Sequence, residues 1–493
     1  MIHKLYSLTD TLEKAKEPLY IRGVKKREGN SILMNKGEVL GFTTYFNSLS
    51  LKKWKRYTTI KALQLVLHLE GRFQVTFHLY DEKGNVRDIS MNTESPCFAH
   101  FFAVEELDGV LFGFSLQCIS DAGVYVEGHW DGEFTHWEDK KIGVSITTFK
   151  RETYVKRTMS LLRDFHQNHP WISVLVVDNG GTLEEIPGQR FRVIHNRNFG
   201  GSGGFTRGMI EYVEQGMVDY VLLMDDDIIL ETSTLERTFS LLSGLKDEYK
   251  DSFLAGAMLS LEEPCRQCEN TAYWDKIISR ICGRNLDLTD ADSLLVNETI
   301  HNHPNAYAGW WYCCIPAKRI VDIGYPIPAF IKSDDMEYGI RNHKEILSIN
   351  GIGVWHQAFA TKMNPAIRYF SDRNSFILNH YAFGCGRGTL ILAVLGRIIK
   401  RLVHGDTKGI AALSSALYAY MEGFDRLTSQ PADAVFAEIR CQPFTENLGI
   451  SLLNIARNAI RIIRYYNRID YKYKSFRQKK LADPVFWKNY LRI

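Results

Sequence analysis

Three consecutive aspartates, Asp225, Asp226 and Asp227, directly follow an apolar segment whose residues favour a buried β-strand. Side chains alternate along an extended strand, so Asp225 and Asp227 are expected to point the same way and Asp226 elsewhere. Hard divalent cations such as Mg²⁺ and Mn²⁺ bind carboxylate oxygens together with the phosphates of a substrate. The triplet therefore predicts a cation site, with a solvated acidic turn as the alternative that the residues alone leave open.

A glycine-rich segment, NRNFGGSGGF, occupies residues 196–205. Glycines let a ligand approach the backbone closely, and the amides at a helix start favour anions. The segment is neither a GxGxxG motif nor a P-loop, because no Gly-Lys-Ser/Thr follows. We interpret it as a loop before a helix that begins near Phe205, either an anion site or a surface turn.

A second acidic group contains Asp334, Asp335 and Glu337, after an apolar segment with two prolines. Transfer of a group to a hydroxyl with inversion needs one carboxylate to accept the hydroxyl proton, and these three residues are candidates. Carboxylates also stabilise the N-terminus of a helix, and both roles are compatible.

An isolated histidine and a pair of tryptophans complete the candidates. His356 ends the apolar run VW, and it becomes a candidate ligand only if the fold brings it to the aspartate triplet. Trp310 and Trp311 are adjacent, and such pairs either fill a core or form a stacking surface for sugar rings.

The elements that must position these residues are visible from Lys141 onward. The runs IGVSITTF, WISVLVVD, FRVIHN and DYVLLMD alternate with helical patterns, which predicts a doubly wound, Rossmann-like α/β domain. Ligands in such sheets bind beyond the carboxyl ends of the strands. Asp178, residues 198–204 and the triplet are therefore expected along one edge of the sheet.

The chain of 493 residues is too long for one compact core, and we divide it into three parts. Residues 1–138 have short alternating strands with turn signals and predict a β-sandwich domain. Residues 139–385 form the α/β catalytic domain, and residues 386–493 form a helical, basic domain.

The bulk properties exclude several classes. A net charge of +3 gives no argument for nucleic-acid binding. We find no secretory signal at the start and no membrane-spanning run, which predicts a cytoplasmic protein, peripheral on the inner face of the cell membrane. Nine cysteines, an odd number in a chain without a secretory signal, suggest reduced thiols. Cys265, Cys268 and Cys282 lack a fourth ligand, so they do not predict a zinc site.

Taken in order, the motifs resemble a known family. TTFKR, VVDNG, NFGGSGGF, DDDI, WW, FIKSDDMEYGIR and VWH resemble the GT-A, family-2 glycosyltransferases, and are similar to the polymerising bacterial galactofuranosyltransferases. The segment TTYFNSLSLKKWKRYTTI resembles the β-sandwich domain of those enzymes. The resemblance implies an inverting, metal-dependent hexosyltransferase with a GT-A domain, which uses UDP-galactofuranose to build a cell-surface polysaccharide.

The resemblance also implies roles for individual residues. The residues implied to act are Asp335 as catalytic base; Asp225, Asp227 and His356 as ligands of Mn²⁺ or Mg²⁺; Arg151, Asp178, Asn198 and Asp226 as donor contacts; and Trp310, Trp311, Asp334 and Glu337 as contacts of the donor or acceptor sugar. One position departs from the family, because Ser371 stands where its FHLRN motif has a histidine. This departure leaves open another donor, such as dTDP-L-rhamnose or a UDP-hexopyranose. A second alternative is a non-catalytic carbohydrate-binding assembly protein.

The C-terminal part carries a basic helical pattern. Arg457, Arg461, Arg464 and Arg468 recur at helical spacing among apolar residues. Such a helix suits either an anionic membrane surface or packing on the fold with a solvated basic face. A membrane surface fits the lipid-linked glycan acceptor that the resemblance implies, and the resemblance also suggests a homo-oligomer.

Overall fold

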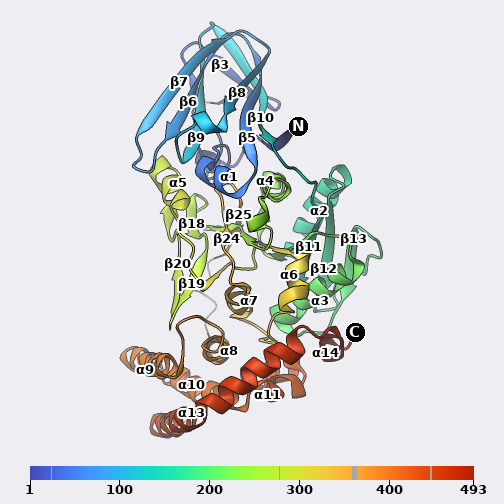
Figure 1. Ribbon diagram of the computed structural model, residues 1–493, viewed down its shortest axis with the longest axis vertical. Coiled ribbons are helices and arrows are strands. Elements are labelled where there is room, and N and C mark those ends of the chain that lie inside the picture. Colours follow the sequence, from blue (N-terminus) through green and yellow to red (C-terminus); the bar gives the residue numbers. More distant parts are fainter. Residues whose placement is uncertain (24, 277, 358–363, 445–446) are drawn as a thin grey trace.

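The computed structural model describes residues 1–23, 25–276, 278–357, 364–444 and 447–493. Figure 1 shows three regions along the long axis: antiparallel sheets at one end, a mixed α/β region in the middle and a group of helices at the other end. The C-terminal helix α14 (Pro484–Leu491) returns to the middle region, where it packs beside α3 (Gly200–Gln215).

The N-terminal region contains two antiparallel sheets, of order β2-β3-β10-β5-β8, with β1 on β10, and β4-β9-β6-β7. Its strands are β1 (Ile2–Ser7), β2 (Lys26–Glu28), β3 (Ser31–Asn35), β4 (Val39–Gly41), β5 (Ile60–Glu70), β6 (Phe73–Tyr80), β7 (Val86–Thr93), β8 (Cys97–Ala103), β9 (Leu111–Cys118) and β10 (Ala122–Phe134). Strand β6, FQVTFHLY, alternates between buried and half-buried side chains. That alternation lets both sheets bury one face against each other, as a β-sandwich requires.

Buried cations join the β-sandwich to the α/β region. Arg237, on α4 (Thr232–Ser243), is fully buried, with its guanidinium carbon 3.7 Å from the ring centre of Tyr6. It also donates to the carbonyl oxygen of Gly351 over 3.1 Å. Lys53, on α1 (Leu51–Tyr57), donates to the carbonyl oxygen of Asn297 over 2.7 Å. These contacts satisfy carbonyl groups across the boundary, so the two regions share one continuous interior.

The central sheet has the order β13-β12-β11-β14-β23-β16-β24. Its strands are β11 (Ile142–Thr148), β12 (Ile172–Asp178), β13 (Phe191–His195), β14 (Tyr220–Asp225), β16 (Phe253–Ala255), β23 (Cys313–Pro316) and β24 (Ile346–Leu347). Strands β11 to β14 are parallel, and Thr147 is in register with Asp225 while Thr148 is in register with Asp178. The predicted alignment of these strand ends along one edge is therefore present.

The glycine-rich segment is not the loop that we expected. Residues 200–204 are the first turns of α3, which lies against β11 and β12. A Cβ atom at Gly208 would lie 1.9 Å from the hydroxyl oxygen of Ser145, and one at Gly204 would lie 2.2 Å from a methyl carbon of Thr147. The prediction of a helix start near Phe205 is wrong, because these glycines let the helix approach the sheet closely.

A second sheet, β15-β25-β17-β18-β21, continues from the end of the aspartate triplet. Its strands are β15 (Ile229–Leu230), β17 (Ala257–Ser260), β18 (Arg266–Glu269), β21 (Leu286–Asp287) and β25 (Gly353–His356). Ile229 pairs with Trp355, so the strand that follows the triplet lies beside the strand that ends at His356. A small third sheet, β20-β19-β22, flanks it and contains β19 (Ala272–Asp275), β20 (Ile278–Ile281) and β22 (Ala306–Tyr307).

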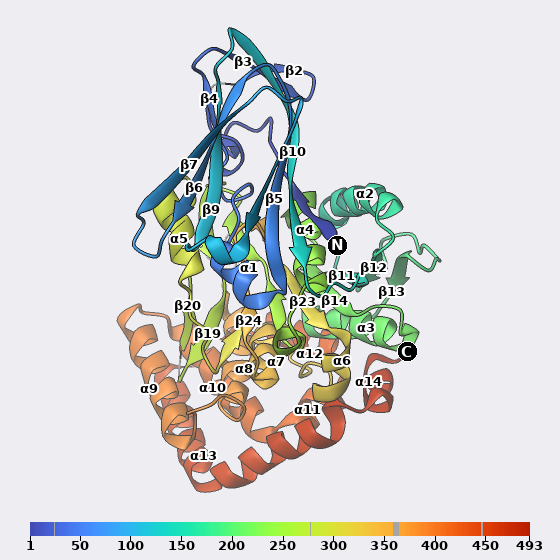
Figure 2. The same ribbon diagram turned by 45° about the horizontal axis from the view of Figure 1, so that its top comes forward.

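Helices cover the sheets and form the third region (Figures 1 and 2). The remaining helices are α2 (Glu152–Asn168), α5 (Ala291–Glu298), α6 (Ala317–Ile323), α7 (Asp334–Asn342), α8 (Pro365–Leu378), α9 (Arg387–Val403), α10 (Thr407–Glu422), α11 (Phe424–Ser429), α12 (Ala432–Cys441) and α13 (Leu448–Phe476). Helix α13 packs on α10 and buries Ile455, Ile462 and Ile469. Within the described ranges, we find no helix that is both long and apolar enough to cross a membrane.

The close approach of α3 to the sheet predicts a stability difference between two helical glycines. Gly208→Ala is expected to lower the free energy of unfolding by about 1–3 kcal/mol, because the new methyl group overlaps Ser145. Gly396→Ala, in α9, meets no atom within 4 Å and is expected to be neutral or stabilising by up to about 1 kcal/mol. Thermal unfolding of both variants measures the difference, and equal midpoints would contradict this packing argument.

Candidate metal and catalytic site

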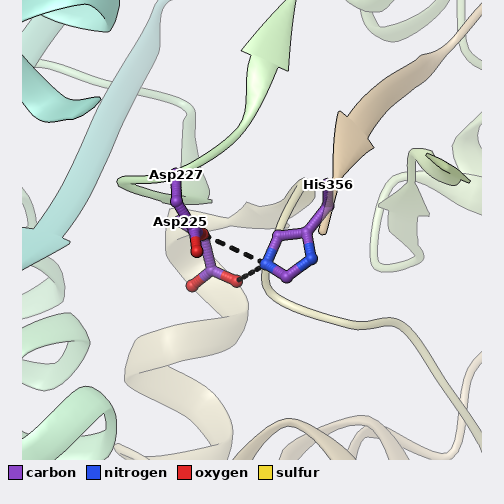
Figure 3. Close-up of side chains that lie close together, drawn as sticks. All are labelled: Asp225, Asp227 and His356. Carbon is purple, nitrogen blue, oxygen red and sulfur yellow. Dashed lines mark ion pairs between the residues drawn. The ribbon is translucent and has the colours of Figure 1, made fainter. Parts of the chain in front are cut away.

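Three predicted ligands converge where the two sheets meet. Asp225 ends β14, Asp227 follows two residues later, and His356 ends β25. The Nε2 atom of His356 lies 3.1 Å from Oδ1 of Asp227 and 3.7 Å from Oδ2 of Asp225 (Figure 3). One possible ligand atom from each residue lies within 4.8 Å of the others, and this is the one group of its kind among the described residues.

The ligand set fits a divalent cation by its chemistry as well as its spacing. The Nδ1 atom of His356 lies 2.6 Å from the carbonyl oxygen of Gln357, so Nδ1 carries a proton and Nε2 faces the carboxylates. A backbone carbonyl that orients a histidine in this way is typical of metal sites. Two carboxylates and one imidazole suit Mn²⁺ better than Mg²⁺, because Mg²⁺ favours oxygen ligands throughout.

Asp226 points away from His356, as predicted, although the strand ends at Asp225 and a turn, not strand alternation, separates it from the ligands. Its carboxylate accepts a hydrogen bond from the Thr148 hydroxyl over 2.7 Å and one from Arg151 over 3.3 Å. Burial raises the pKa of Asp226 to about 6, and the hydrogen bond from Thr148 opposes that rise. Arg151 also donates to Asp227 over 2.5 Å, so its guanidinium links the two carboxylates.

The second acidic group lies on an unusual loop. Phe330, Lys332 and Ser333 all have positive φ angles, of 70°, 66° and 65°. Such backbone is costly for residues other than glycine and must be held from outside. Asn374 of α8 holds it, because its amide nitrogen donates to the carbonyl oxygens of Ile331 over 2.9 Å and of Lys332 over 2.8 Å.

This loop places Asp334 and Asp335 at the N-terminus of α7. Burial raises the pKa of both carboxyl groups. The charge of Asp335 raises the pKa of Asp334 further, to about 7, whereas Lys332 opposes the rise for both. Asp334 is buried and Asp335 half-buried, and the charge of one disfavours ionisation of the other, so the pair retains a proton to higher pH than an isolated aspartate.

The metal ligands and the carboxyl pair open into one cleft with a volume of about 560 Å³. Predicted residues that line it are Arg151, Asn198, Asp225, Asp226, Asp227, Trp310, Trp311, Asp334, Asp335 and His356. Each of the two tryptophans is 5% exposed, so both pack in the interior, and both also line the cleft, where stacking on a sugar ring stays a prediction. The Trp311 indole donates to the carbonyl oxygen of Gly256 over 2.8 Å, which fixes its ring.

Two predicted contact residues are not brought to this cleft. Asp178 is fully buried, and its carboxylate accepts hydrogen bonds from the backbone amides of Gly180, Thr182 and Leu183. It therefore shapes the turn after β12 and is not among the residues that line the cleft. Glu337 is fully buried in an ion pair with Arg341 at 2.7 Å and does not line the cleft either. Their contacts with a donor or a sugar stay predictions.

The cleft also contains residues that sequence reasoning missed. Thr148 lies at the end of a predicted strand, and Lys332 lies just before the acidic pair. Those positions were the signal in the sequence that could have identified both residues. Ile367, Phe436 and Arg440 come from α8 and α12, and no pattern in the sequence marks them.

A further acidic group near the cleft was also missed. The Glu269 side chain is half-buried, and burial together with the charge of Asp335 raises its pKa to about 8.

Ser371 lies on α8 and is not among the residues that line the cleft. The cysteines are all free thiols and none joins a metal-ligand group in the described part of the chain.

Comparison with known proteins shows which families this chain resembles. Residues 11–126 match the family model Galactofuranosyltransferase 2 N-terminal, and residues 144–253 match Glycosyl transferase family 2. The chain is 25% identical to galactofuranosyltransferase GlfT2 of Mycolicibacterium smegmatis over 79% of its length, and 26% identical to GlfT2 of Mycobacterium tuberculosis over 79%. It spans about two thirds of those relatives, 65% and 66% of their lengths.

One similar solved structure is a mannosyltransferase from Pyrobaculum calidifontis in complex with GDP-Man and Mn²⁺. Its sequence is 11% identical to this chain, and the aligned region covers 66% of this chain and 88% of the mannosyltransferase, with a TM-score of 0.34. That likeness carries no functional argument. The family matches confirm the resemblance that the motifs indicated. The expected fold class, an α/β GT-A domain with an N-terminal β-sandwich and a C-terminal helical region, is also confirmed.

The ligand geometry predicts selective loss of metal binding. His356→Ala is expected to weaken Mn²⁺ binding by at least about tenfold, because changes even around metal ligands cost that much. Calorimetric titration with Mn²⁺ measures the affinity, and the rise in unfolding temperature on adding Mn²⁺ should shrink in parallel. His404→Ala, an exposed histidine at the end of α9, is the matched control and should bind Mn²⁺ normally. Equal affinities for the two variants would remove His356 from the site.

Proposed function

From the two family matches and this cleft, we propose that the chain is an inverting, metal-dependent glycosyltransferase. Its proposed reaction transfers galactofuranose from UDP-galactofuranose to a glycan acceptor in the biosynthesis of a cell-surface polysaccharide. The observation that carries the proposal is the convergence of Asp225, Asp227 and His356 in the same cleft as Asp335. The choice of sugar is supported by the relatives, whose names describe galactofuranosyltransferases.

The donor end of the proposed site uses the residues at the sheet edge. Asp225, Asp227 and His356 would hold Mn²⁺ or Mg²⁺, which when bound supplies positive charge against the phosphates of the leaving nucleotide. Arg151 would turn from the carboxylates of Asp226 and Asp227 toward the donor, because a guanidinium binds phosphate well. Asp226 would then accept hydrogen bonds from the donor sugar.

The acceptor end uses the buried carboxyl pair. The acceptor hydroxyl would attack the anomeric carbon opposite to the departing phosphate oxygen, which inverts the configuration at that carbon. Its proton would pass to the carboxylate of Asp335, whose raised pKa makes it a stronger base than an exposed aspartate. The charge of Lys332 opposes the rise in pKa of both carboxyl groups and so favours their ionised forms.

Two rival functions compete with this proposal, and the first concerns the sugar of the donor. Ser371 replaces a family histidine, and dTDP-L-rhamnose or a UDP-hexopyranose is the alternative donor. A non-catalytic carbohydrate-binding protein is the second rival, and it would not require Asp225, Asp227, Asp335 and His356 to meet in one cleft. Turnover of a panel of nucleotide-sugars separates all three readings.

We also propose that the acceptor is lipid-linked and that the protein attaches peripherally to an anionic membrane surface. The support is the set of exposed arginines on α13, whose opposite face packs on the fold. The helix can therefore pack on the fold and still present a basic face to a membrane. A homo-oligomer stays a prediction.

The assignment of Asp335 as the catalytic base predicts that its replacement slows sugar transfer. Asp335→Asn is expected to lower the transfer rate by about 10²–10⁴-fold, because general-base catalysis contributes that much. The rate is measured as UDP release from UDP-galactofuranose with acceptor and Mn²⁺, and EDTA should abolish it. Asp322→Asn, at an exposed site on α6, is the matched control and should retain the wild-type rate. A wild-type rate for Asp335→Asn would assign the base elsewhere.

The carboxyl pair also predicts the pH dependence. A base must be unprotonated, and burial raises the pKa of Asp335, so the transfer rate should fall on acidification at a higher pH than for an exposed aspartate. Asp334→Asn removes a neighbouring negative charge, which lowers the pKa of Asp335 and should move the acid limb to lower pH. Rates measured from pH 4 to 9 test this, and an acid limb that stays in place would show that another group titrates.

A further inference from the structure

Two cavities lie beside α10 and α13, which pack against each other in the helical region (Figures 1 and 2). Their volumes are about 480 Å³ and 310 Å³. Tyr418 and Arg461 line both cavities, so the two adjoin, and together they are called the α10–α13 groove. It lies outside the catalytic cleft and shares no lining residue with it.

The groove is strongly basic. Arg457 and Arg461 line the larger cavity, which has no carboxylate in its wall. Arg461, Arg468 and Lys472 line the smaller cavity together with Glu422. Four cations therefore face one acid, and the attraction of such a concave surface for an anion exceeds that of scattered surface charges.

The other lining groups complete a site for a polar anion with an apolar attachment. Ser414, Ser415 and Asn458 bring hydroxyl and amide donors to the larger cavity. Tyr418 and Tyr465 are 47% and 44% exposed, so each ring combines an apolar face with a hydroxyl group.

Stabilisation of a helix end does not account for the whole charge. Arg468 and Lys472 lie beside the C-terminal end of α10, where cations interact favourably with the helix dipole. Arg461 lines both cavities and so reaches from that end to Ser414 and Ser415, two turns earlier. Arg457 lines only the larger cavity, and because the dipole effect falls off within the last turn, the helix end does not account for its position.

We propose that the α10–α13 groove binds a phosphate group, carried by a lipid head group or by a soluble phosphate or diphosphate. Arginine side chains bind phosphate oxygens through paired N–H groups, and several of them converge here. Leu453 and Ile460, on the same helix, are exposed at 51% and 65% and line neither cavity.

The position of the groove relates it to the catalytic cleft. Ile439 and Gln442, from the end of α12, contribute to the larger cavity. Phe436 and Arg440 of the same segment line the catalytic cleft. A phosphate-bearing carrier in the groove would thus be separated from the cleft by one helix. Its use as an acceptor carrier rests on the proposed function, whereas phosphate binding itself does not.

The test compares two arginines on one helix. Arg461→Gln removes the cation that both cavities share, and Arg464→Gln removes an exposed arginine on α13 that lines neither cavity. Binding is measured with the full chain, without divalent metal or nucleotide-sugar, so that failure of the transferase proposal leaves the result readable. The probes are inorganic pyrophosphate, by calorimetry, and vesicles of phosphatidylglycerol and phosphatidylcholine, by co-sedimentation.

Arg461→Gln is expected to raise the Kd for at least one probe by about fivefold or more, with Arg464→Gln within about twofold of wild type. Selective loss for pyrophosphate identifies a soluble phosphate, and selective loss for vesicles alone identifies a lipid head group. Equal losses for the two variants would mean diffuse surface attraction and overturn the groove. Binding of neither probe by the wild type would overturn it as well. Unfolding temperatures of both variants confirm that each is folded.

Discussion

Negative charge concentrated at the end of one buried strand is the constraint on which this site depends. Asp225, Asp226 and Asp227 place three carboxyl groups on consecutive residues, and burial raises the pKa of the first two. The chain resolves this repulsion by dividing the triplet. Asp226 is satisfied by Thr148 and Arg151, while Asp225 and Asp227 face an imidazole and together form a ligand set for a cation.

The rest of the fold brings distant groups to that strand end. The strand after the triplet pairs with the strand that ends at His356, so the sheet itself sets the distance between carboxylates and imidazole. Asn374 holds a loop of positive φ angles, and the loop in turn places Asp334 and Asp335 at the start of α7. Side-chain hydrogen bonds thus maintain backbone that would otherwise be unfavourable.

The C-terminal helices contribute more than a cover. Helix α8 carries Asn374, and α12 completes the wall of the cleft with Phe436 and Arg440. Helix α13 uses Ile455, Ile462 and Ile469 to pack on the fold, which leaves its arginines exposed. Packing and basic charge therefore coexist on one helix, and three of these arginines line the groove beside α10.

The sequence by itself determined the local features. Strand alternation predicted that Asp225 and Asp227 share a direction, and the order of strands predicted the edge where the triplet lies. Local pattern was a poor guide where glycines served packing, so residues 200–204 became helix instead of loop. Only the tertiary structure decided that Asp178 and Glu337 turn away from the cleft and that α12 lines it. Asp178 and Glu337 turn away through short-range contacts, with the amides of the next turn and with Arg341, which compete with a role in the cleft. The place of α12 depends instead on helix packing between residues more than 100 positions apart, and no local pattern in one sequence records such contacts.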